Sequence, residues 1–174
     1  MRKRLIIIVC MVALASALLL PSAATAATTL TKLEQQVVTL VNQKRAKHGL
    51  AKLRVHARLQ AAARAHSTEM SNRKYFSHSS AGGESFERRI IRYGYKRSGY
   101  SYWAAGENIA WGGGLYATAS AVVNSWMRSP GHRAVILTRK FRDVGLGAVV
   151  CKSGYSSCPV PVTFFTLDVG RRID

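Results

Sequence analysis

Acidic residues are scarce in this sequence. The 174-residue chain has 8 Asp and Glu against 26 Lys and Arg, a formal net charge of +18 at pH 7. Such a field favours anionic partners, among them acidic cell-wall polymers, anionic lipid head groups and nucleic acid. The basic residues are scattered and form no nucleic-acid-binding motif, so we expect no nucleic-acid partner. General solubility with loose surface adhesion explains the charge equally well.

The chain also lacks linkers, low-complexity tracts and internal repeats, so we expect one domain. Its one long apolar run, residues 5–20, follows three basic residues at 2–4 and precedes small residues at 24–26, as in a secretory signal peptide. We expect cleavage after residue 26, with an uncleaved N-terminal anchor as the alternative. The leader, residues 1–26, holds three basic residues and no acid, so the secreted domain, residues 27–174, carries a net charge of +15. We expect no membrane span in that domain.

Cysteine is scarce as well, with three in the chain, one of them inside the leader. The other two, Cys151 and Cys158, are separated by a Gly- and Ser-containing loop. Export places them in an oxidising compartment, which predicts one disulfide that closes a small hairpin loop. No His or acid lies between the two cysteines, which argues against a metal site there.

Hydrophobic spacing predicts helices first and strands last. This order indicates an α+β fold, with helices packed on a small sheet. An Ala-rich face on the second helix favours close packing against a neighbouring element. We expect helices over 31–48, 56–73 and 117–128, a shorter helix that begins at 82–83, and a helical turn over 132–137. A brief strand is expected over 107–110, followed by a flexible glycine connector at 112–114. The last two expected strands, 144–150 and 160–169, form an antiparallel hairpin.

Three side chains have the chemistry of a metal centre or of general acid–base catalysis. His78 lies in a serine-rich loop, Glu107 in a glycine-flanked turn, and His132 directly after a Pro-Gly break. Spacing alone leaves a structural role open for each: His78 as a surface loop residue, Glu107 as a cap or salt-bridge partner, and His132 as a hydrogen-bonding residue at a helix start.

Four segments in order, FSH, GENIA, VVNSWMRSPGHRAVIL and FRDVGLG, resemble the bacterial branch of the CAP superfamily, with its SCP-like extracellular domain. This superfamily comprises cysteine-rich secretory proteins, antigen 5 and pathogenesis-related proteins. The resemblance covers about 33–169. It implies a three-layer α-β-α sandwich with a small, mainly antiparallel sheet. It also implies a cavity in which His78, Glu107 and His132 match family positions, and in some members the His pair binds a divalent metal.

The sequence departs from the family pattern at the second cavity acid, where Ser129 stands. We therefore expect a cleft of His78, Glu107, His132 and Ser129. Its metal ligands would be His78 and His132, which suit a weakly held divalent metal, with zinc preferred. Val135 stands where many bacterial relatives have Asn, so any polar contact made there is lost.

Other conspicuous residues have plainer interpretations. We predict that His66 is a hydrogen-bonded core histidine and that Trp126 is a core anchor. Several aromatic residues flank a glycine-rich stretch, and two roles stay open for them: a groove for sugar or lipid, or a cover over the sheet. These aromatic residues are Tyr100, Tyr102, Trp103 and Trp111.

These observations favour a secreted, monomeric CAP domain that binds rather than catalyses. Its expected partner is anionic or amphiphilic material, either a cell-wall polymer or lipid. The alternative is a secreted metal-dependent hydrolase of peptide or cell-wall polymer, with Glu107 as general base. The sequence offers no evident nucleophile and one convincing carboxylate, whereas a hydrolase of this kind needs a nucleophile or a second carboxylate. A third interpretation is purely electrostatic adhesion, which salt would abolish.

Overall fold

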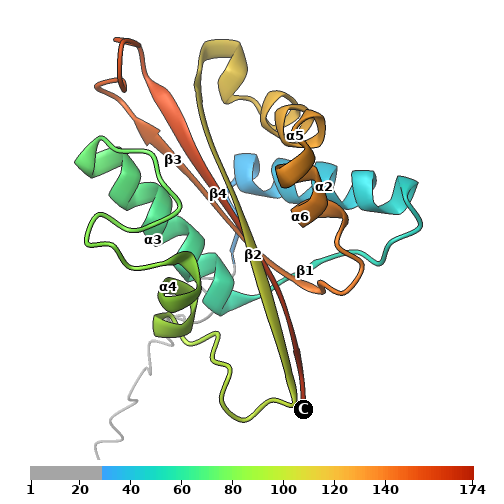
Figure 1. Cartoon of the computed structure of the whole chain (residues 1–174). Coiled ribbons are helices and arrows are strands. Elements are labelled where there is room, and N and C mark those ends of the chain that lie inside the picture. The colour runs from blue at the N-terminus through green and yellow to red at the C-terminus, as the bar shows by residue number, and fades with distance from the viewer. Residues whose placement is uncertain (1–28) are drawn as a thin grey trace, which may run out of the picture.

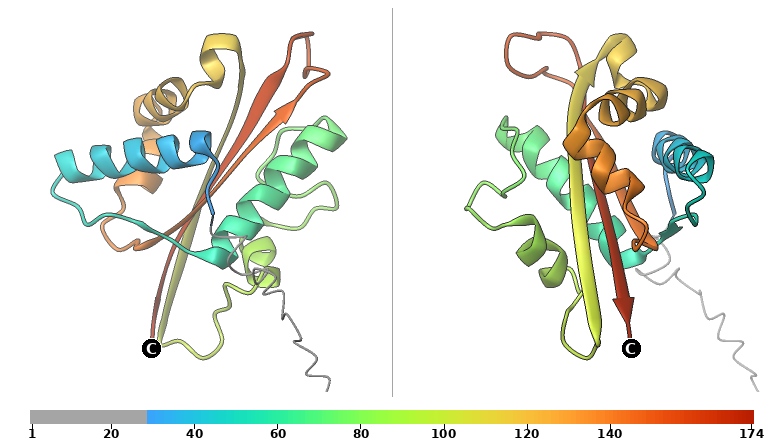
Figure 2. Two further views of the ribbon diagram at one scale, coloured as in Figure 1. Left: turned by 180° about the vertical axis from the view of Figure 1, so that it is seen from behind. Right: turned by 45° about the vertical axis from the view of Figure 1, so that its right-hand side comes forward.

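A four-stranded sheet lies between two layers of helices in the computed structural model, which describes residues 29–174 (Figure 1). Helices α3 and α4 cover one face of the sheet, and α2, α5 and α6 cover the other (Figure 2). The predicted three-layer α-β-α sandwich is therefore confirmed. The signal peptide expected at 1–26 lies outside the described residues.

The predicted helices are confirmed to within a few residues, whereas β2 is three times longer than the brief strand expected at 107–110. Of the glycines expected to form a flexible connector, Gly112 and Gly113 belong to this strand, because β4 pairs with it as far as Gly113, and Gly114 begins the 3-10 helix that follows. The elements in order are α2 (Lys32–Lys47), β1 (Arg54–Val55), α3 (Ala57–Arg73), α4 (Phe86–Arg92), β2 (Tyr102–Gly113), the 3-10 helix η1 (Gly114–Ala117), α5 (Ala119–Arg128), α6 (Pro130–Leu137), β3 (Asp143–Cys151) and β4 (Val162–Ile173).

The strands lie in the order β1-β3-β4-β2. The short β1 pairs with β3 in parallel, and the other two pairings are antiparallel, so the sheet is mainly antiparallel as predicted. The predicted hairpin is formed by β3 and β4. Strand β2 pairs with β4 along its whole length and forms one edge of the sheet. Helix α4 contacts β2 from one face of the sheet, and α5 and α6 contact it from the other.

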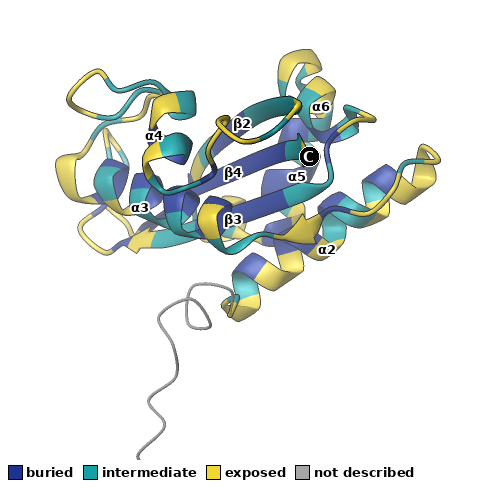
Figure 3. Cartoon of the chain, turned by 90° about the horizontal axis from the view of Figure 1, so that it is seen from below, coloured by how far each residue is buried: buried dark blue, intermediate teal, exposed yellow. Residues whose placement is uncertain are grey.

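Strand β4 supplies side chains to both layers, because successive residues of a strand point to opposite faces. Phe165 and Leu167 belong to the apolar cluster under α2, α5 and α6. Thr166, between them, faces α3, where its hydroxyl accepts a hydrogen bond from Ser67 at 2.8 Å. The strands form the most buried layer of the molecule (Figure 3). The predicted core anchor, Trp126, is buried on the apolar side.

Helix α3 packs directly on the backbone of β3 at two glycines. A Cβ on Gly145 would lie 2.1 Å from the carbonyl carbon of Leu59, and one on Gly147 would lie 2.3 Å from the carbonyl oxygen of Ala63. No other residue fits at so close an approach. The small side chains on this face of α3 are part of the predicted Ala cluster, so the expected close packing is confirmed. The contact fixes α3, and with it the loop that follows.

The predicted disulfide is wrong: the structure has Cys151 and Cys158 as free thiols. The Sγ of Cys151 faces the end of α3 and lies 2.5 Å from Lys74 Nζ. The Sγ of Cys158 faces β2, 3.5 Å from where a Cβ on Gly113 would be. Two backbone hydrogen bonds between Tyr155 and Cys158, both 3.0 Å, close the loop instead.

Candidate functional site

Glu107 is buried in the middle of β2, and both of its carboxylate oxygens are engaged. Oε1 accepts a hydrogen bond from His78 Nδ1 at 2.8 Å, and Oε2 pairs with the buried guanidinium of Arg89 in α4. A buried carboxylate is tolerated when a charged partner compensates it, and Arg89 supplies that charge. Glu107 therefore joins strand β2 to helix α4 and holds His78 at the same time.

The hydrogen bond to Glu107 determines the tautomer of His78. An ionised carboxylate only accepts hydrogen bonds, so Nδ1 of His78 carries the proton and Nε2 of the neutral ring is left with its lone pair. The His78 side chain is 52 % exposed, whereas that of Glu107 is 1 % exposed. A carboxylate behind a histidine is the usual arrangement for orienting a metal ligand.

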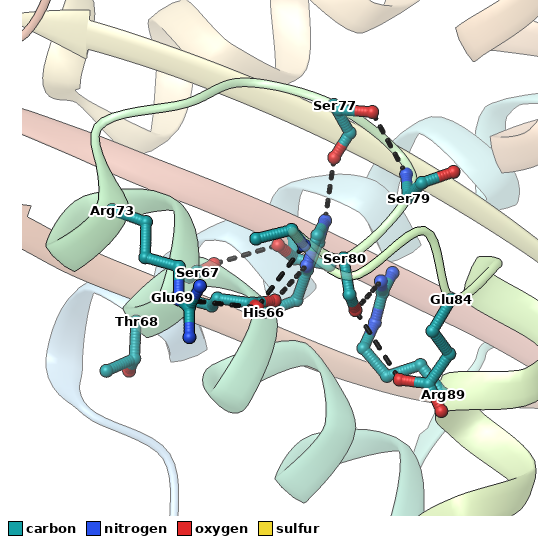
Figure 4. A network of polar contacts seen from close by, with 12 residues as sticks. His66, Ser67, Thr68, Glu69, Arg73, Ser77, Ser79, Ser80, Glu84 and Arg89 are labelled. Atoms are coloured by element: carbon teal, nitrogen blue, oxygen red, sulfur yellow. Dashed lines mark hydrogen bonds and ion pairs between the residues drawn. The ribbon is translucent and has the colours of Figure 1, made fainter.

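The loop that carries His78 is held from beneath by side chains of α3 and α4, which converge on it in Figure 4. The buried ring of His66 places Nε2 2.8 Å from the carbonyl oxygen of Ser77. Arg89 Nη1 donates to the carbonyl oxygen of His78 and to Ser80 Oγ, both at 3.1 Å. His66 is thus the core histidine that was predicted, and it also supports the site.

His132 lies in the first turn of α6, on the other side of β2. Asn108, which follows Glu107 in the strand, donates from Nδ2 to the carbonyl oxygen of His132 at 2.9 Å. Glu107 and Asn108 point to opposite faces of β2, so one residue holds the His78 loop and the next holds α6. Burial, and then the charge that His78 carries when it is protonated, lower the pKa of His132. The two imidazoles are therefore within electrostatic reach of each other at the β2 edge of the sheet.

Ser129 occupies the bend between α5 and α6. Its backbone N–H bonds to the carbonyl oxygens of Ser125 and Trp126, both at 3.2 Å. The Ser129 side chain makes no capping hydrogen bond to the first turn of α6. In the described part of the chain, Ser129 thus turns the backbone towards His132, and no hydrogen bond ties its hydroxyl to the other cleft residues.

The sequence analysis missed a second buried acid, Asp168 of β4. It is the register partner of Glu107 across the two strands, and it is fully buried. Neither of its carboxylate oxygens finds a hydrogen-bond partner among residues 29–174. Burial and then the negative charge of Glu107 raise the pKa of Asp168 well above its ordinary value. The sequence feature that could have indicated this buried acid is the position of Asp168 inside a run of β-branched and aromatic residues, which is typical of a buried strand.

The donor set of the site suits a weakly held metal. Among residues 29–174 no group of three or more His, Cys, Asp or Glu side chains is arranged to hold a metal ion. Because Glu107 is already committed to Arg89 and His78, the donors left are the imidazoles of His78 and His132. Two imidazoles with water in the remaining positions fit a zinc of modest affinity, with Glu107 acting on His78 rather than on the metal.

Comparison with models of known protein families assigns this chain to a family. Residues 38–169 match the family model of the cysteine-rich secretory protein family, or CAP. The chain belongs to this family. The match covers β2, both histidines and the β3–β4 hairpin as far as Val169.

Two Bacillus subtilis proteins are similar to this CAP domain. The uncharacterized protein YkwD is 41 % identical over 117 residues, which are 67 % of this chain and 42 % of YkwD. The uncharacterized membrane protein YlbC is 35 % identical over 114 residues, 66 % of this chain and 31 % of YlbC. The chain thus matches less than half the length of each.

Solved structures share the fold. An extracellular protein containing an SCP domain from Bacillus anthracis superimposes with a TM-score of 0.61 at 27 % identity, covering 82 % of this chain and 44 % of that one. An outer surface protein from Borrelia burgdorferi gives a TM-score of 0.62 at 20 % identity, covering 83 % and 96 %. At 20 % identity the second likeness shows the fold alone.

The other acids of this CAP domain do not complete a catalytic pair. Glu69 accepts a hydrogen bond from the Tyr75 hydroxyl at 2.8 Å, and Glu84 pairs with Arg92 at 2.7 Å. Asp168 is enclosed between the sheet and α3. The acids that surround the site therefore support the loop or the helix, and Glu107 is the one that reaches a cleft histidine.

Proposed function

We propose that this CAP domain is an extracellular binding protein that holds a divalent metal, zinc by preference, between His78 and His132. The observation that carries the proposal is the chain of contacts from Arg89 through Glu107 to His78 Nδ1. With Nδ1 engaged by Glu107, Nε2 is the nitrogen of His78 that is free to bind a metal, and the lowered pKa of His132 favours the neutral imidazole that a metal requires.

The leader expected at 1–26 supports an extracellular location, as does the description of the similar Bacillus anthracis structure as an extracellular protein. No helix in residues 29–174 has the length and apolar character needed to cross a membrane. The excess of basic residues supports an anionic or amphiphilic partner at a cell surface. The relative YlbC is described as a membrane protein, in keeping with a partner at such a surface.

The geometry supports binding over hydrolysis. A general base needs a carboxylate oxygen that can approach a water or a substrate proton. Both oxygens of Glu107 are held by Arg89 and His78, and Asp168 beside it is fully buried. Glu107 therefore orients a ligand better than it accepts a proton.

Zinc titration by calorimetry tests the metal site on residues 27–174. We expect one zinc per chain, and at least about a tenfold loss of affinity for His78→Ala and for His132→Ala. Glu107→Gln should weaken binding by roughly 10- to 100-fold, because it changes the group that orients His78. His48→Ala, at an exposed histidine on the C-terminal end of α2, is the matched control and should bind as the parent does. Equal zinc binding by the parent and the His78→Ala/His132→Ala double variant would disprove the site.

The hydrolase alternative is tested with the zinc-loaded domain on casein and on peptidoglycan. We expect no cleavage above that of the His78→Ala/His132→Ala double variant. Cleavage that disappears in folded, zinc-binding Glu107→Gln would instead establish Glu107 as a general base, and the binding proposal would fail.

A further inference from the structure

The end of β2, the helix η1 and the loop that joins β3 to β4 lie at the end of the molecule opposite the C-terminus (Figures 1 and 2). Large apolar side chains in and beside these segments are exposed. Leu115 and Tyr116 of η1 are 85 % and 78 % exposed, and Trp111 of β2 is 38 % exposed. Val150 and Val160, at the two ends of the loop that joins β3 to β4, are each more than half exposed. These five residues are called the apolar end below.

The apolar end is a firmly supported surface. The Trp111 ring meets the edge of Tyr155 at a centroid distance of 5.0 Å, and Tyr155 in turn meets buried Phe164 at 5.1 Å. A hollow of about 460 Å³ lies between the strand end and the loop, lined by Trp111, Tyr116 and Val160 among others. The Trp111 ring is therefore anchored to the core through Tyr155, so docking it costs little conformational entropy.

The charge around the apolar end has one sign. Residues 109–142 and 144–167, which include both segments of this end, contain no Asp or Glu. Lys152 is exposed in the loop itself. Lys74, at the end of α3, reaches the same loop through hydrogen bonds to Ser153 Oγ at 2.5 Å and to the carbonyl oxygen of Gly154 at 2.8 Å. Apolar side chains are thus combined here with basic ones.

We infer that the apolar end inserts into the surface of an anionic lipid bilayer. Its apolar side chains would enter the boundary between head groups and acyl chains, while the lysines meet anionic head groups. A soluble polyanion would satisfy the lysines but would leave Leu115, Tyr116 and Trp111 in water. This inference rests on the proposed function for the class of partner, and it places that partner on a surface that contains neither His78 nor His132.

Vesicle sedimentation with residues 27–174 tests the inference, since the apolar leader would itself bind lipid and every described helix and strand lies within 29–174. The vesicles are phosphatidylcholine with or without phosphatidylglycerol. We expect binding to the anionic vesicles and, for Leu115→Ser/Tyr116→Ser, at least about a tenfold fall in the partition coefficient. Ile173→Ser is the matched control: it is 43 % exposed but lies at the opposite end, so binding should be unchanged.

Tryptophan fluorescence gives a second readout. Insertion should shift the emission to the blue on addition of anionic vesicles, and Trp111→Phe should lose that shift while Trp103 and Trp126 remain. Three results overturn the inference: equal vesicle binding by Leu115→Ser/Tyr116→Ser, equal binding to neutral and anionic vesicles, or binding to soluble polyglutamate without binding to vesicles. The His78→Ala/His132→Ala variant lacks the proposed zinc ligands but keeps the apolar end, so it should still bind vesicles. A failure of the zinc proposal can therefore be distinguished from a failure of the lipid proposal.

Discussion

The two faces of the sheet bury different kinds of side chain. Towards α2, α5 and α6 the interior is an apolar cluster, with Trp126, Ile136 and Phe165 among its largest members. Towards α3 and α4 the buried set is rich in polar and charged groups. That set includes Gln60, His66, Ser67, Ser71, Arg89, Glu107, Thr166 and Asp168.

The two faces therefore have different physical tasks. Apolar burial stabilises the fold in proportion to the area removed from water and has little directional preference. Buried polar groups cost desolvation energy unless each finds a partner, but the partners they find have defined directions. Arg89 and Glu107 use that property to hold His78 in one orientation. The apolar cluster under α2, α5 and α6 thus contributes to stability, and the polar set on the other face contributes the geometry of the site.

The largest expected effect is on the apolar face. Trp126→Ala should lower the free energy of unfolding by about 4 kcal/mol, because it leaves a cavity under α5 and removes the hydrogen bond from Nε1 to the carbonyl oxygen of Ile109. Urea denaturation measures this loss. Trp111→Ala, at the apolar end, is the control and should cost far less. Zinc affinity of the folded fraction should not change; if it falls tenfold, the two faces are not separate in function.

A smaller loss of stability, with a large loss of zinc affinity, is expected on the polar face. Arg89→Met should cost about 3 kcal/mol, because it leaves Glu107 buried without a compensating charge and releases the His78 loop.

The double variant Arg89→Met/Glu107→Leu is the control for that substitution. It should recover most of the stability, since neither partner of the buried ion pair is left without the other, but not the zinc affinity. Denaturation and calorimetry on both variants measure the two effects. Recovery of zinc affinity in the double variant would show that the ion pair does not orient His78.

The smallest effect concerns Asp168 and depends on pH. Burial raises the pKa of Asp168, so its protonated form persists to higher pH in the folded state than in the unfolded chain, where the carboxyl ionises at about pH 3.9. Its contribution to stability is thus complete below about pH 3.9 and is lost as the pH rises through the native pKa. Asp168→Asn cannot ionise, so its melting temperature relative to the parent should rise from pH 4 to pH 8. A difference that is constant over this range would show that Asp168 is ionised in the folded protein.

Local patterns account for most of what was predicted correctly. The capping box at Thr31 and Glu34 marks the start of α2, where both reciprocal hydrogen bonds form. The alternation in 144–150 and 160–169 marks the hairpin, and the four family segments mark the cleft residues. Each of these signals lies within a few residues along the chain, where spacing and propensity act directly.

The errors and omissions lie where distant segments meet. The disulfide was inferred from compartment and spacing, but the directions of Cys151 and Cys158 depend on what each packs against. The extent of β2 depends on how far β4 continues to pair with it. The burial of Arg89 against Glu107 depends on the position of α4 over β2, which no local pattern in the sequence indicates.

The sequence by itself determined the layers of this protein, the order of its helices and strands, and the identity of two histidines and a glutamate with the right chemistry. Only the tertiary structure decided that Glu107 is clamped by Arg89, that Asp168 lies beside it, and that the two histidines approach one edge strand from opposite faces. The reason is physical: periodicity is a property of neighbouring residues, whereas strand register and helix placement depend on packing between residues far apart in the chain.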